Sequence, residues 1–127
     1  MKFKTLAIIT AVILFVLGLG YMFFGALIVG RWDVVPTESV LLLARRIGCL
    51  YLGLSVVFFL ARPAPASATR TALCAGTAVV TSLLAGSGVY EFAVGHAAGG
   101  ILASAAIEFL LAVGYIWILI SERKISA

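Results

Sequence analysis

Two adjacent arginines and one glutamate are the residues of this sequence whose types and positions point to chemistry. Arg45 and Arg46 interrupt the apolar run 41–54, and Glu108 interrupts the apolar run 101–110. A charged side chain inside hydrocarbon costs about 2.5–3.5 kcal/mol on insertion scales, so such a residue nearly always has a partner or lines a wet cavity. We therefore expect an intramembrane salt bridge between Glu108 and one arginine, and the sequence favours neither of the two.

Three interpretations of this polar core stay open. The ion pair can be purely structural, or it can also line a ligand site. Ser104 and Tyr115 share a helix face with Glu108 by their spacing, and Tyr51 lies on the same segment as the arginines, so these side chains would complete such a site. In the third interpretation the arginine side chains extend to the lipid headgroups, and Glu108 is protonated and inert.

The sequence argues against several kinds of redox and metal centre. His96 is the only histidine, so one chain cannot hold a haem between two histidines. Cys49 and Cys74 lack a CxxC spacing, and no cluster of His, Cys and acidic residues has metal-ligand spacing. We predict no catalytic residue, no metal and no cofactor, and a quinone or a lipid is the class of ligand that a pocket would accept.

The composition identifies the solvent of this chain as lipid. Hydrophobic residues make up 64% of it and charged residues only 11%, whereas soluble domains carry about 25% charged residues. The net charge of +4 therefore does not indicate a nucleic-acid partner. It indicates instead how the chain is oriented in the membrane.

Four apolar segments must position the polar residues. The first begins like a signal peptide, but its apolar run is about 25 residues long, well beyond the usual 7–15, so we expect a retained span. Small residues recur every four positions on the third segment, at Ala78, Ser82 and Gly86. This stripe indicates either a packing face or only the general richness of membrane helices in small residues. We predict an all-α integral membrane four-helix bundle, a single domain over 1–127 with spans at about 5–29, 39–61, 71–89 and 98–120.

The distribution of charge predicts the orientation of the bundle. One side holds most of the basic residues, namely Lys2, Lys4, Arg62, Arg70, Arg123 and Lys124. The other side holds Asp33, Glu38 and Glu91. The positive-inside rule then places both termini and the loop 62–70 in the cytoplasm. With about 1.5 Å of rise per residue, the arginine pair and Glu108 both lie roughly 10 Å below the outer surface.

The second span also carries a resemblance to a known group. Its residues 44–54, ARRIGCLYLGL, are similar to the RR-x-G-x-L-Y-L-G-L entry of small DoxX-like bacterial membrane proteins, and the proline-bearing loop and Glu108 fit the same pattern. The resemblance implies a four-helix inner-membrane protein from a largely uncharacterised group, linked to quinol-oxidising or redox complexes as a small subunit. It implies that the arginines and Glu108 form the polar core, and it implies no catalytic residue.

The sequence is consistent with three hypotheses for the function of the protein. The leading one is a non-enzymatic inner-membrane protein, either an accessory subunit or a module with a lipid or quinone pocket. The alternatives are a homodimeric proton-coupled transporter and a membrane enzyme acting on a lipid or a small electrophile. The expected partners are membrane lipid and either further copies of the chain or a larger membrane complex, with no nucleic acid.

Overall fold

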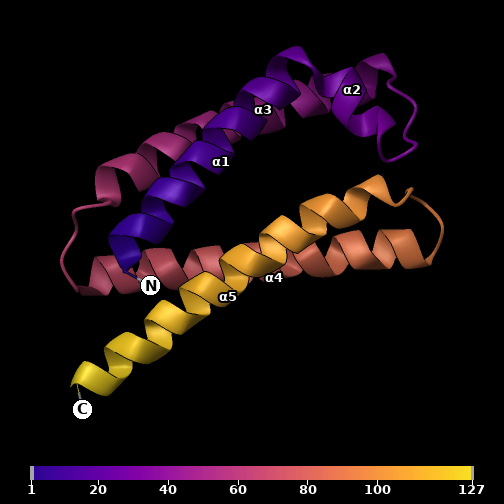
Figure 1. Cartoon of the computed structure of the whole chain (residues 1–127). Coiled ribbons are helices and arrows are strands. Elements are labelled where there is room, and N and C mark those ends of the chain that lie inside the picture. The colour runs from indigo at the N-terminus through magenta and orange to yellow at the C-terminus, as the bar shows by residue number, and fades with distance from the viewer. Residues whose placement is uncertain (1, 127) are drawn as a thin grey trace.

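The chain is all-α, as predicted, in a computed structural model that describes residues 2–126 and the side chains of 2–122 (Figure 1). Its helices are α1 (Phe3–Phe23), α2 (Gly25–Gly30), α3 (Glu38–Ala61), α4 (Ala68–Ala93) and α5 (Gly100–Ser126), with no strand in the described part. Four helices, all but α2, are long and apolar enough to span a membrane. The predicted fold class of four membrane-spanning helices is therefore confirmed.

Side-chain caps fix where two of the spans begin. The hydroxyl of Thr37 accepts a hydrogen bond from the Val40 N–H at 3.4 Å, and Glu38 occupies the first turn of α3. The hydroxyl of Ser67 accepts from the Arg70 N–H at 3.2 Å and caps α4 in the same way. Both residues satisfy N–H groups that a helix start leaves without a partner.

The first apolar segment is divided, whereas the sequence predicted one continuous helix over 5–29. Phe24 leaves the helical region, with φ −126° and ψ 28°, so α1 ends there and the short α2 follows. The break places Gly25 against α3, where a Cβ added to Gly25 would lie 3.2 Å from the Cβ of Ala44. Small residues at this point let α2 remain close to α3.

The spans form two antiparallel pairs, α1 with α3 and α4 with α5 (Figure 1). Gly18 and Gly48 lie where α1 crosses α3. A Cβ added to Gly48 would lie only 2.7 Å from the carbonyl oxygen of Gly18, so the two backbones are in direct contact. Such contact gives helices in lipid the van der Waals packing that replaces the hydrophobic effect.

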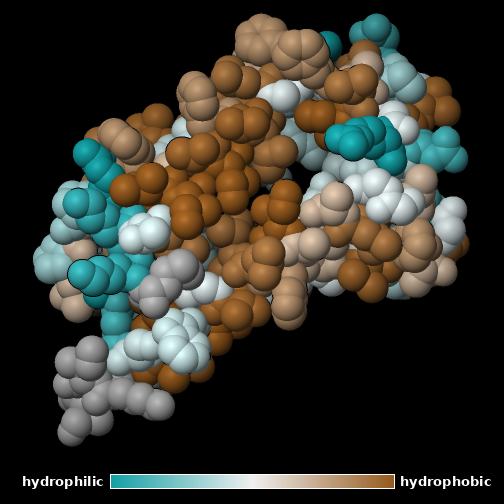
Figure 2. Space-filling view, viewed as in Figure 1, coloured by the Kyte–Doolittle hydropathy of each residue, from teal (hydrophilic) through white to brown (hydrophobic). Residues whose placement is uncertain are grey.

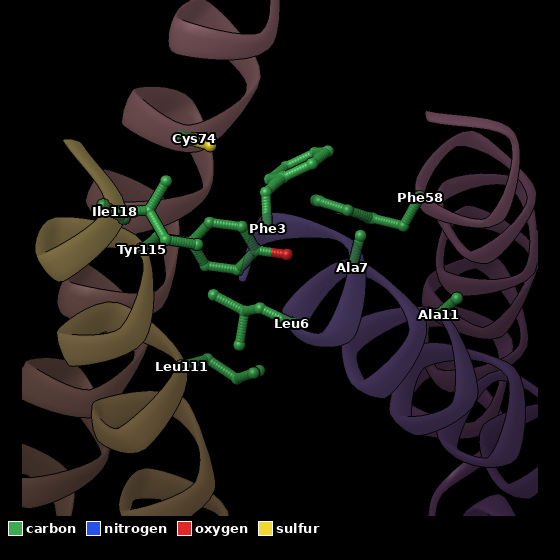
Figure 3. Close-up of a cluster of buried hydrophobic side chains, with 10 residues drawn as sticks. Phe3, Leu6, Ala7, Ala11, Phe58, Cys74, Leu111, Tyr115 and Ile118 are labelled. Carbon is green, nitrogen blue, oxygen red and sulfur yellow. The ribbon is translucent and has the colours of Figure 1, made fainter. Parts of the chain in front are cut away.

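The pairs meet through a buried cluster at the end of the molecule where α1 begins (Figure 3). Phe3, Leu6 and Ala7 of α1 lie between the two pairs in this cluster. The Phe58 ring of α3 lies 5.8 Å from the ring of Tyr115 on α5, centroid to centroid. The hydroxyls of Thr10 and Tyr115 share a hydrogen bond of 2.8 Å, which joins α1 to α5 inside the apolar core.

A second contact joins the pairs at the opposite end, between their connecting loops. The Ala98 N–H donates a hydrogen bond of 2.8 Å to the carbonyl oxygen of Trp32. Gly100 lies directly on the carbonyl of Arg31, where an added Cβ would overlap the oxygen. The two pairs are thus connected both at the basic end, which carries the N-terminus and the loop 62–67, and at this loop end.

The packing face of α4 differs from the predicted stripe of small residues. Ala78 is buried as expected, but Ser82 and Gly86 are exposed. The buried face instead contains Cys74, Ala78, Thr81, Ala85 and Gly88. Its positions alternate spacings of three and four, which follow the helical period of about 3.6 residues more closely than a strict spacing of four.

The surface has the polarity that a membrane requires. Figure 2 shows an apolar band across the middle of the molecule, with hydrophilic residues gathered toward its ends. Large apolar side chains on every span are exposed, among them Phe15, Leu50, Leu83 and Leu110. In water such a surface would aggregate, so these side chains face lipid or a neighbouring helix.

Candidate functional site

Glu108 interacts electrostatically with two tyrosines, one from each helix of the other pair. It is half-buried on the face of α5 that also carries the buried Ala105 and Ala112. Its carboxyl interacts electrostatically with Tyr21 of α1 and Tyr51 of α3. We call Glu108, Tyr21 and Tyr51 the tyrosine–glutamate site; it draws on three of the four spans.

Aromatic contacts orient the tyrosines of this site. The rings of Tyr21 and Tyr51 meet edge to face, with their centroids 5.7 Å apart. The ring of Trp32, from the loop after α2, lies 6.3 Å from that of Tyr21. Both distances suit favourable aromatic pairs. The rings of Tyr21 and Tyr51 are therefore held by their aromatic neighbours.

The structure does not bring the two arginines to Glu108. Arg45 and Arg46 are both exposed on α3, and neither forms an ion pair with Glu108 within 4 Å. For Arg46 the reason is angular. At about 100° per residue, Arg46 lies some 200° around α3 from Gly48, whose backbone packs on α1. Matching depth is thus not sufficient for contact.

The ion pairs of the described residues lie near the two ends of the molecule. At the basic end Arg70 of α4 pairs with Glu122 of α5, with 14% and 22% of these side chains exposed. At the loop end Nδ1 of His96 lies 2.9 Å from a carboxylate oxygen of Glu91. The first pair ties α4 to α5 where both helices approach the surface.

The remaining predicted site residues lie on α5 but have separate surroundings. Ser104 is half-buried one turn before Glu108. Tyr115 is completely buried in the cluster between the pairs, where Thr10 and Phe58 contact it. Seven residues, or about 10 Å along the helix, separate Tyr115 from Glu108. Tyr115 therefore belongs to the core and not to the tyrosine–glutamate site.

The arrangement favours binding by hydrogen bonds. Phenol groups donate to the carbonyl oxygens of a quinone or an ester, and a carboxyl group accepts from a hydroxyl or, when protonated, also donates. In the described part of the chain no three His, Cys, Asp or Glu residues are close enough to hold a metal ion. Cys49 is exposed and Cys74 is buried, and neither forms a disulfide.

Sequence reasoning missed Tyr21, Thr10 and the Arg70–Glu122 pair. Tyr21 lies about as far along its apolar segment from the loop end as Glu108 does along α5. The depth comparison that was applied to the arginines would therefore have identified Tyr21 as a neighbour of Glu108 in depth. Arg70 and Glu122 both lie at the basic end of their spans. The same comparison of depth, applied at that end, would have predicted their ion pair. Nothing in the sequence distinguishes Thr10 from the other polar residues of the spans, because only the packed structure places it opposite Tyr115.

Four span-forming helices and a polar site between them define the class: this is a multi-pass membrane protein. Comparison of the chain with protein-family models, with curated proteins and with solved structures finds no match.

Proposed function

We propose that this protein is a non-enzymatic accessory subunit of a larger complex in the bacterial inner membrane, and that α3 contacts the partner. The observation that carries the proposal is the exposure of Arg45 and Arg46 on an apolar helix. With about 1.5 Å of rise per residue, both start roughly 10 Å below the beginning of α3 at Glu38. Exposed charge at that depth calls for a neighbour outside the chain.

A partner helix with a carboxylate would supply what these arginines lack. A guanidinium keeps its charge in any protein environment and donates hydrogen bonds in a fork that fits a carboxylate. Leu42 and Leu50 lie one turn before and after Arg46 on the same exposed face. This face therefore offers both apolar packing and a charge to a partner helix.

The resemblance of residues 44–54 to the DoxX-like group supports the same proposal, since that group is linked to redox complexes as a small subunit. We infer membership of that group from this segment, the proline-bearing loop and Glu108. The resemblance also implies one polar core of the arginines and Glu108. In this proposal that core is divided: Glu108 belongs to the tyrosine–glutamate site, and the exposed arginines belong to the contact surface on α3.

Site-specific photo-crosslinking in native membranes tests the proposal. A photoreactive residue at Leu42 or Leu50 should give a protein adduct of defined mass, and the same residue at Leu83, an exposed leucine of α4, is the matched control. The Arg46→Leu variant should lose the adduct and Arg46→Lys should retain most of it. An adduct of twice the chain mass identifies a second copy, and a different mass identifies another subunit.

Two outcomes would contradict the proposal. Adducts with lipid alone at Leu42 and Leu50 would mean that the arginines extend to headgroups. Protein adducts of equal yield from Leu83 would mean that α3 is not the contact surface.

A second candidate function rests on the tyrosine–glutamate site, which would bind a quinone or a lipid carbonyl between the two helix pairs. Quinones quench tryptophan fluorescence, and Trp32 lies beside Tyr21. In a Trp117→Phe background, a short-chain quinone should quench Trp32 saturably. The Tyr21→Phe and Glu108→Leu variants should weaken this quenching, whereas the exposed Tyr90→Phe should not. Quenching that rises linearly with quinone concentration in every variant would exclude the site.

A further inference from the structure

A pocket of about 420 Å³ opens at the basic end of the molecule, away from the tyrosine–glutamate site. The start of α1, the loop after α3 and the ends of α4 and α5 that lie there surround it. Four cations line it, Lys2, Lys4, Arg62 and Arg70, and the single acid among its described lining residues is Glu122. The lining therefore carries a net charge of +3.

Protein contacts hold two of these cations in place. Arg70 donates from Nη1 to the Ala64 carbonyl at 2.8 Å and pairs with Glu122, and its guanidinium lies 5.0 Å from the centroid of the Phe3 ring. Arg62 donates to the Phe59 carbonyl and lies 3.8 Å over the Phe59 ring. Fixed cations lose little side-chain freedom when a ligand binds, which favours affinity.

Arg70 also has more donors than its protein partners use. A guanidinium carries five N–H donors. Its Nε–H is buried and has no hydrogen-bond partner. Lys2 and Lys4 are exposed at the opening. The pocket thus combines unused donor capacity with positive charge, which is the chemistry of an anion site.

The rest of the lining is apolar and indicates which anion fits. Phe3, Pro63 and Ile118 line the pocket beside the cations; Pro63 is exposed, and the edges of the largely buried Phe3 and Ile118 form the apolar floor. A free phosphate has no apolar atoms to contact such a surface, whereas a phospholipid presents a phosphodiester, a glycerol and acyl chains together. A zwitterionic lipid would bring its ammonium group against the cations. The mixed lining therefore selects a phospholipid of net negative charge.

We propose that this basic pocket binds the headgroup of an anionic phospholipid, with Lys4 and Arg62 contacting the phosphodiester and the apolar lining contacting the glycerol and acyl carbons. The site lies at the membrane surface on the side of the Arg62–Arg70 loop. It is independent of the α3 contact surface and of the tyrosine–glutamate site.

Native mass spectrometry of the full chain in detergent tests this proposal by titration with phosphatidylglycerol, phosphatidylcholine of the same acyl chains, and inorganic phosphate. Phosphatidylglycerol should bind more tightly than phosphatidylcholine. Each basic residue near an anionic headgroup contributes a factor of about five, so Arg62→Gln should weaken binding about fivefold and Lys4→Gln/Arg62→Gln roughly 25-fold. Arg62→Lys keeps the charge and should keep most of the binding.

Arg31→Gln is the matched control, because it removes one exposed arginine at the loop end. Equal weakening in Arg31→Gln and Arg62→Gln would overturn the proposal, as would equal affinity for the two lipids. Full displacement of the lipid by equimolar inorganic phosphate would show a soluble-anion site and overturn it as well. Should the double variant fail to fold, the wild type still decides: phosphatidylglycerol binding must weaken as salt rises, and binding insensitive to salt would exclude the site.

Discussion

At the scale of single residues, the polar groups inside the membrane are divided among three places. Glu108 interacts electrostatically with two tyrosines, Tyr115 shares a hydrogen bond with Thr10 in the core, and the arginine pair is exposed on α3. Depth along each helix is readable from the sequence, because the rise per residue is fixed. The angle around the helix axis decides which groups at one depth meet. That angle depends on which face packs, and the apolar residues all around α3 leave the packed face undetermined in the sequence.

The separation of the arginines from Glu108 has a measurable consequence. In the isolated chain, the effects of Arg46→Leu and Glu108→Leu on the free energy of unfolding should add to within about 0.3–0.5 kcal/mol, as for sites without contact. The measurement is a double-mutant cycle on unfolding in detergent, repeated with Arg45→Leu. A coupling energy above about 1 kcal/mol in either cycle would show that an ion pair forms within the chain.

The Thr10–Tyr115 hydrogen bond should behave in the opposite way. Tyr115→Phe and Thr10→Val each remove the bond between α1 and α5, and each should lower the free energy of unfolding by about 0.5–1.5 kcal/mol. The double variant should cost clearly less than the two losses together, because only one bond is lost. Tyr90→Phe removes an exposed hydroxyl and should have no effect. Strict additivity of Thr10 and Tyr115 would mean that the bond contributes nothing to stability.

At the scale of the elements, hydropathy and turn residues predict the spans well, while their irregularities come from packing. Prolines in the loops and caps at Thr37 and Ser67 explain why α3 and α4 begin within three residues of the predicted bounds. The break at Phe24 has no such signal, because no proline occurs there and the segment stays apolar on both sides. The break is explained by packing on α3, because Gly25 lies against Ala44 there.

The contact between Gly18 and Gly48 predicts a specific sensitivity in the α1–α3 pair. Gly48→Ala would place a Cβ against the backbone of α1, so it should destabilise the protein by about 1–3 kcal/mol. Gly53→Ala on the same helix meets nothing within 4 Å and should be neutral or slightly stabilising, since alanine favours helix. Thermal unfolding in detergent compares the two. Equal effects would mean that the helices do not cross at Gly48.

At the scale of the whole molecule, four spans predict that both ends of the chain lie on one side of the membrane. The excess of basic residues on that side predicts that it is the cytoplasmic one. Hydropathy therefore predicts the number of spans, and the distribution of basic residues predicts their orientation. The sequence does not predict that the bundle divides into two pairs, because hydrophobicity alone does not rank the possible helix contacts in lipid.

Cysteine labelling tests the orientation. In a Cys49→Ser/Cys74→Ala background, Ala66→Cys in the loop after α3 should resist a membrane-impermeant maleimide in intact cells and react after lysis. Val35→Cys in the loop before α3 is the matched probe and should react in intact cells. Both residues are exposed, so a difference between them reports sidedness. The reverse pattern would invert the orientation.

The division into two pairs has a consequence for how the chain is made. Each pair consists of consecutive spans, so α1 and α3 can associate as a hairpin before α4 and α5 have been synthesised. The joint between the pairs, by contrast, links Thr10 to Tyr115, residues 105 positions apart in the chain. Docking of the two hairpins must therefore wait until the last helix has entered the bilayer. Until then the early hairpin keeps Thr10 and the apolar face around Leu6 open to lipid or to another membrane helix.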